Sequence, residues 1–202
     1  MVKTNDAANI TNSIKCLSVL ESKTAVLYNF LSEKVELPLI KAMFKEISLD
    51  SKKHSTILYG VSKSLPETNW KPKDCQKTLG KVIAAVDTFV KDLSKVKTLP
   101  DTNMSELSKQ LISFESSMGE EYFVFVQLKT LQFMVKEISK IYNINLESLK
   151  DIFTEIIEDE EHHREILATI SELVRKKKDD EEKDNTPFVR FQNPDAWISP
   201  IP

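Results

Sequence analysis

Residues 156–167, which read I-I-E-D-E-E-H-H-R-E-I-L, decide the fold class of this chain. One line of residues at alternating steps of three and four runs through this stretch and beyond it: Ile156, Glu160, His163, Leu167, Ile170 and Val174. Residues three and four apart share one face of a helix, so the stretch predicts an amphipathic helix with this line buried. Glu160 and His163 interrupt the apolar line. A Glu-x-x-His pair on an inner helical face is typical of metal sites inside helical bundles.

The composition is that of a globular protein with one core. The chain has 202 residues, of which 41% are hydrophobic and 29% charged, and its three glycines favour long uninterrupted helices. No apolar run approaches the ~20 residues of a membrane span. The N-terminus has no apolar signal core, so we expect a cytoplasmic protein. The net charge of −3 mixes both signs along the chain and predicts no nucleic-acid partner.

Helical periodicity extends over five segments, expected at about residues 6–35, 38–62, 74–96, 104–142 and 146–175. Pro38 suits the first turn of a helix, and the links before it and at residues 143–145 are short. Short links predict two antiparallel helical hairpins, with the middle segment as an extra helix in the long crossover between them. Residues 1–176 would form this all-α bundle, and residues 177–202, a charge run followed by a proline-rich segment, an irregular tail.

The two hairpins repeat each other's polar residues. Residues 21–28 read E-S-K-T-A-V-L-Y and residues 115–122 read E-S-S-M-G-E-E-Y, so that in each a Glu precedes a Tyr by seven positions. Residues 50–58 read D-S-K-K-H-S-T-I-L and residues 159–167 read D-E-E-H-H-R-E-I-L. The second pair aligns without a gap.

This pattern resembles the ferritin-like superfamily, most closely its rubrerythrin-type domains, over about residues 10–175. The resemblance implies a ferritin-like four-helix bundle that holds two irons by one Glu from each of two helices and a Glu-x-x-His from each of the other two. The matching ligands are Glu21, His54, Glu115, Glu160 and His163. Glu160 would bridge the two ions, and Glu21 and Glu115 would each bind one.

Two positions depart from the family's pattern. Ser51 stands where the second bridging Glu is expected, and Met118 stands where rubrerythrins often carry a further Glu. Three carboxylates against two divalent ions leave a net charge of +1, so Ser51 predicts fewer or looser ions than a complete site. Asp50 and Asp159 lie next to the ligand positions, although their stripe faces further outward.

Each candidate also has a simpler interpretation. Taken singly, Glu21 and Glu115 would be helix-edge carboxylates, and His54 a satisfied core or rim histidine. Tyr28 and Tyr122 would be core residues first, with a hydrogen bond to a ligand carboxylate as the alternative. The five ligand types gain weight because they fall on four core stripes in repeat register.

The leading hypothesis is a metal-binding protein of the rubrerythrin kind, with one or two iron ions and zinc or manganese as alternatives. If active, it would be an oxidoreductase that oxidises ferrous iron or reduces peroxide or oxygen, with a small oxidant entering opposite Ser51. The rival hypothesis is a degenerate, non-enzymatic bundle that acts through its tail and extra helix. A homodimer is compatible with both.

Cys16 and Cys75 form no C-x-x-C pair. This spacing excludes a cysteine-based zinc site and an appended rubredoxin-like module. We expect both thiols to be reduced in the cytosol.

Overall fold

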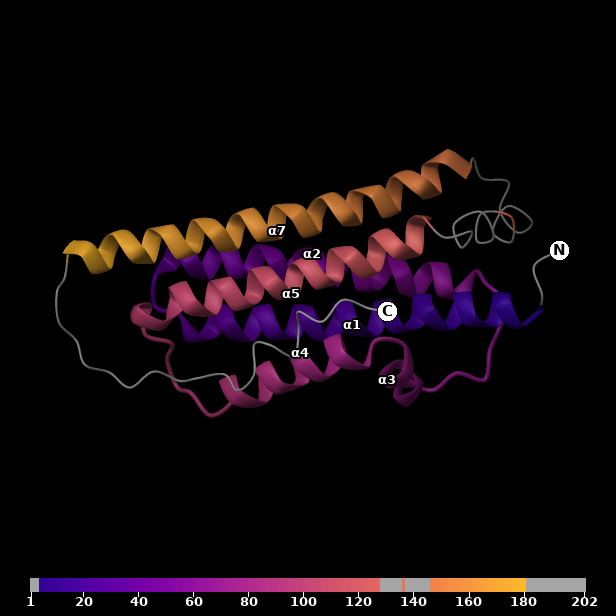
Figure 1. The fold of residues 1–202 in the computed structure, drawn as a ribbon, viewed down its shortest axis with the longest axis horizontal. Helices are drawn as coiled ribbons and strands as arrows, with labels where there is room; N and C mark the ends of the chain where they lie inside the picture. The colour runs from indigo at the N-terminus through magenta and orange to yellow at the C-terminus, as the bar shows by residue number, and fades with distance from the viewer. Residues whose placement is uncertain (1–3, 128–135, 137–145, 181–202) are drawn as a thin grey trace.

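The computed structural model describes residues 4–127, 136 and 146–180 (Figure 1). Four long helices lie along the longest axis of the molecule: α1 (Thr4–Lys34), α2 (Pro38–Lys63), α5 (Asp101–Gln127) and α7 (Leu146–Asp180). No strand occurs in these described ranges. The molecule is therefore all-α, as the sequence predicts.

The long helices form two antiparallel pairs. α1 packs chiefly against α2, and α5 packs chiefly against α7. A crossover carries the chain from the end of α2 to the start of α5, so that these two helices run in the same direction (Figure 1). This connection is that of a ferritin-like bundle, and it confirms the predicted architecture.

The crossover contains a short 3₁₀ turn, η1 (Pro72–Asp74), and two helices, α3 (Cys75–Thr78) and α4 (Gly80–Leu93). The sequence predicted one helix over residues 74–96, and this prediction was wrong. Leu79 breaks it with φ −124° and ψ 29°, next to Gly80, a residue with low helix propensity. α4 packs its apolar face on α1, and Lys23 of α1 pairs with Asp87 of α4.

Two of the helix ends differ from the expected ones by a few residues. α2 begins at Pro38, as expected, and α5 begins at Asp101, earlier than expected. α7 continues past Arg175 to Asp180, because lysines are good helix formers and suit the C-terminal end of the helix dipole. The described residues do not include 181–202, which hold the rest of the expected tail. They also do not include 128–135 and 137–145, which hold the expected end of the helix 104–142 and the link after it. The division into a bundle domain (1–176) and a tail stays a prediction.

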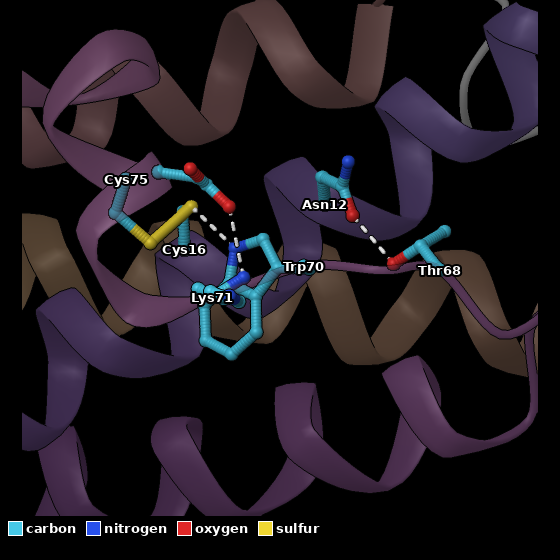
Figure 2. The surroundings of a disulfide bond; sticks show 7 residues. Asn12, Cys16, Thr68, Trp70, Lys71 and Cys75 are labelled. Carbon is cyan, nitrogen blue, oxygen red and sulfur yellow. Dashed lines mark hydrogen bonds between the residues drawn. A yellow bond between two sulfur atoms is a disulfide. The ribbon is translucent and has the colours of Figure 1, made fainter.

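A disulfide joins Cys16 of α1 to Cys75 at the start of α3, with Cα atoms 5.2 Å apart (Figure 2). The expectation of two reduced thiols was wrong, because the crossover returns to α1 and brings together cysteines 59 positions apart. The Trp70 indole donates a hydrogen bond to the Cys16 Sγ at 3.4 Å. Thr68 in the same loop donates to Asn12 of α1, so the loop and the disulfide both hold the crossover on α1.

Apolar residues from all four long helices and from α4 fill one core, including Leu27, Phe44, Phe114 and Phe153. Midway along the bundle this core is interrupted by buried acidic and imidazole side chains. None of the described helices is both long enough and apolar enough to cross a membrane.

Candidate metal centre

Each long helix contributes a buried polar side chain to the middle of the bundle. Glu21 comes from α1, His54 from α2, Glu115 from α5, and Glu160 and His163 from α7. Glu160 is 2% exposed and the other four are fully buried. Unpaired charges at such depth cost several kcal/mol, so the group needs mutual compensation or a bound ion.

The five side chains form two groups that share one member. One group is Glu21, His54 and Glu160, and the other is Glu115, Glu160 and His163. Within each group the possible ligand atoms lie within 4.8 Å of one another. Glu160 is therefore the one residue common to both groups.

The inner nitrogen of each imidazole faces the carboxylates. The His54 Nδ1 lies 3.5 Å from the Glu21 Oε1 and 3.6 Å from the Glu160 Oε1. The His163 Nδ1 lies 3.4 Å from the Glu115 Oε2 and 3.9 Å from the same Glu160 oxygen. Both imidazoles thus converge on Glu160.

The outer nitrogen of each imidazole faces an aspartate on the neighbouring helix. The His54 Nε2 lies 2.8 Å from the Asp159 Oδ2 of α7, and the His163 Nε2 lies 3.6 Å from the Asp50 Oδ2 of α2. A carboxylate on one ring nitrogen fixes the tautomer and leaves the other nitrogen free to bind a metal. Asp159 was not among the predicted site residues, although the D-x-x-x-H spacing repeated in both helices is a signal that could have identified it.

Burial and neighbouring charge perturb the acid–base equilibria of the cluster. Burial, with the charges of Glu115 and Glu21, raises the pKa of Glu160 well above its usual value. Burial also opposes ionisation of Glu115, but its contacts with His163 outweigh this effect and lower its pKa. Burial disfavours the charged form of His163, yet Asp50 and Glu115 raise its pKa to about 9. Without metal, these residues therefore neutralise one another in part.

Tyr28 and Met118 lie around the candidate ligands, and the contact of Tyr28 combines the two interpretations that the sequence left open. The Tyr28 hydroxyl donates a hydrogen bond to the Glu115 Oε1, so this tyrosine contacts a candidate ligand as well as packing in the core. Met118 is buried, and its sulfur accepts a hydrogen bond from the Thr24 hydroxyl at 3.5 Å. Tyr122 lies in α5, and its side chain is outside the described part of the chain.

Several buried atoms of the cluster lack a hydrogen-bond partner among the residues that the structure describes. They are the Ser51 Oγ, the His54 Nδ1, the His163 Nε2 and both carboxylate oxygens of Glu160. Buried polar atoms are normally paired, and coordination would satisfy the inner nitrogen and the Glu160 oxygens. Carboxylate and imidazole together suit iron, zinc and manganese. The residues present therefore fit a metal ion.

Comparison with known proteins adds an independent observation. The family model described as Rubrerythrin matches residues 18–125, which is more than half of the chain. The match covers Glu21, His54 and Glu115 and ends before α7, which carries Glu160 and His163. No curated protein and no solved structure matched the chain.

Proposed function

Because this chain belongs to the rubrerythrin family, we propose that it binds one or two iron ions in the middle of the bundle and carries out redox chemistry there. The observation that supports the proposal most strongly is the pair of buried ligand clusters that share Glu160. Both clusters are buried, unlike the acidic groups that often gather on a protein surface without binding a metal.

The proposed ligands divide by hairpin. Glu21 and His54, from α1 and α2, would hold an ion on one side of the shared carboxylate. Glu115 and His163, from α5 and α7, would hold an ion on the other side. Glu160 would contact both, and its raised pKa means that its proton would leave when a metal binds.

Ser51 sets the expected stoichiometry. It is fully buried on the same face of α2 as His54, in the position aligned with Glu160. A hydroxyl is neutral and short, so it neither spans two ions nor supplies a fourth negative charge. One divalent ion should bind tightly and a second more weakly.

Iron would supply the electrons, and the protein would supply the environment. Reduction of hydrogen peroxide to two waters takes two electrons and two protons, so the chemistry that iron would supply requires both clusters to hold a ferrous ion, with the protons coming from solvent. Mixed Glu and His ligation tolerates both iron charges. Asp159 and Asp50 would hold the imidazoles in their binding orientation, and Tyr28 would hold Glu115. Ferrous iron oxidation and oxygen reduction fit the same site.

Ser51 also favours a second candidate function. A family member that has lost one bridging carboxylate would persist as a non-enzymatic helical bundle, acting through contacts with other proteins or with a second copy of itself. A homodimer is compatible with either function.

The expected cytoplasmic location stays a prediction, and the Cys16–Cys75 disulfide weighs against it, because disulfides persist mainly in oxidising compartments.

A peroxide reaction of the iron-loaded protein separates the two functions. Wild type loaded with ferrous iron under anaerobic conditions should change its near-ultraviolet absorbance when peroxide is added. Glu160→Ala should abolish the change, whereas Glu158→Ala, which removes an exposed carboxylate of the same helix, should retain it. Iron-loaded wild type that stays inert to peroxide and to oxygen would contradict the redox proposal and support the interaction role.

A further inference from the structure

The proposed ligands have no direct access to solvent, since all five are buried. The residues that contact their outer nitrogens are partly exposed: the Asp50 and Asp159 side chains are 27% and 24% exposed. Each of these carboxylates therefore has one side toward a ligand imidazole and another toward water. They lie between α2 and α7, which make fewer direct contacts with each other than the helices within either hairpin.

A lysine occupies the outer side of both carboxylates. The Lys53 Nζ lies 2.7 Å from the Asp159 Oδ2 and 3.5 Å from the Asp50 Oδ1. It also lies 3.5 Å from the Oε1 of Glu155, which is 62% exposed on α7. The Lys53 side chain is 40% exposed, so it stands at the boundary between solvent and the buried cluster.

Lys53 and a ligand imidazole share one oxygen atom. The Asp159 Oδ2 accepts hydrogen bonds from both the Lys53 Nζ and the His54 Nε2. On the other half of the site, the His163 Nε2 is buried, faces Asp50 at 3.6 Å and has no hydrogen-bond partner within the described ranges. The two aspartates thus join an outer cation position to both ligand imidazoles.

We propose that Asp50 and Asp159 form the entry by which a divalent metal ion passes from solvent to the buried cluster, and that Lys53 is the gate that the ion displaces. This inference rests on the proposed metal-binding function. A lysine ammonium is a compact charge on a flexible stem, so it can leave the carboxylates without moving the backbone. Two carboxylates with a replaceable monovalent cation are a suitable first contact for a hard divalent ion.

The gate makes a prediction about rate that the ligand assignment alone does not make. Removing the Lys53 charge should free the aspartates and speed metal uptake, while all five ligands stay in place. Lys52 is the matched control, because it is exposed, adjacent and equally charged. Lys53→Met and Lys52→Met carry the same net charge, so a difference between them reports position and not overall charge.

Stopped-flow mixing of the full-length metal-free protein with cobalt(II) measures the effect through the absorbance of the bound ion. Lys53→Met should take up cobalt roughly tenfold faster than Lys52→Met at low salt, since a local charge at an entry changes association rates by that order. Lys53→Arg should be no faster than wild type, because a guanidinium holds carboxylates through two bonds. Melting curves establish that each variant is folded.

The outcomes separate this inference from the function on which it rests. If wild type binds cobalt and Lys53→Met matches Lys52→Met in rate, the gate is overturned and the metal site stands. A Lys53→Arg protein as fast as Lys53→Met would also overturn it. If wild type binds no cobalt at equilibrium, the metal site and the gate both fail.

Discussion

Asp159 of α7 lies 2.8 Å from the imidazole of His54 in α2, while it is the residue next to the candidate ligand Glu160 in its own helix. Asp50 of α2 faces His163 of α7 across the same interface, but at 3.6 Å, beyond hydrogen-bond distance. Each helix thus places an aspartate against the histidine of the other helix, and each aspartate lies four residues before the histidine of its own helix. These contacts link the orientation of each imidazole to the packing of the opposite helix.

Asp159→Asn tests this relationship. An amide leaves the ring geometry intact but removes the charge that favours the Nε2 proton, so it should weaken cobalt or zinc binding about 10- to 100-fold. Asp151→Asn, an exposed substitution in the same helix, should leave the affinity unchanged. Equal affinities for the two variants in a metal titration would remove Asp159 from the site.

Ser51→Glu should increase the metal stoichiometry. The new carboxylate would supply the missing negative charge and raise the count from about one tight ion toward two. Without metal it would crowd a fourth carboxylate into a buried cluster, so the melting temperature of the metal-free protein should fall. Thr56→Glu places the same charge on the exposed side of α2 and should do neither. Two tight ions in wild type would contradict this explanation of Ser51.

Metal binding should release protons. The pKa of His163 is raised to about 9 in the metal-free protein, so below that pH this imidazole is protonated and competes with the metal. Burial disfavours the charged form of His54, but Glu21 and Asp159 raise its pKa as well. The affinity should therefore increase with pH up to about 9 and then level off. Calorimetry in buffers of different ionisation enthalpy counts the protons, and an affinity independent of pH between 6.5 and 8.5 would refute the assignment.

The Cys16–Cys75 disulfide should stabilise the fold independently of the metal. It closes a loop of 59 residues in the unfolded chain, and reduction should lower the free energy of unfolding by about 2 to 4 kcal/mol. A protein with both Cys16→Ser and Cys75→Ser should show the lower stability and no further response to reductant. Denaturant unfolding with and without reductant measures both. Wild type with the same free energy of unfolding in the two conditions would contradict a stabilising role for the bond.

The sequence predicted those parts of the site that depend on one helix at a time. Glu160 and His163 fall on an apolar stripe that has to be buried, and helical periodicity alone places them. Asp159 was not assigned, because one helix alone shows its stripe facing outward, and only the spacing between α2 and α7 brings it to His54. The disulfide and the break at Leu79 likewise depend on how the crossover returns to α1.

An anaerobic equilibrium titration of ferrous iron into wild type and Glu160→Ala tests the central claim most directly. Glu160 is the member common to both ligand clusters, so its loss removes a ligand from each. Wild type should bind about one ion tightly and a second more weakly, and Glu160→Ala should bind none tightly. Equal tight binding by the two proteins, or no binding by wild type, would contradict a metal centre built around Glu160.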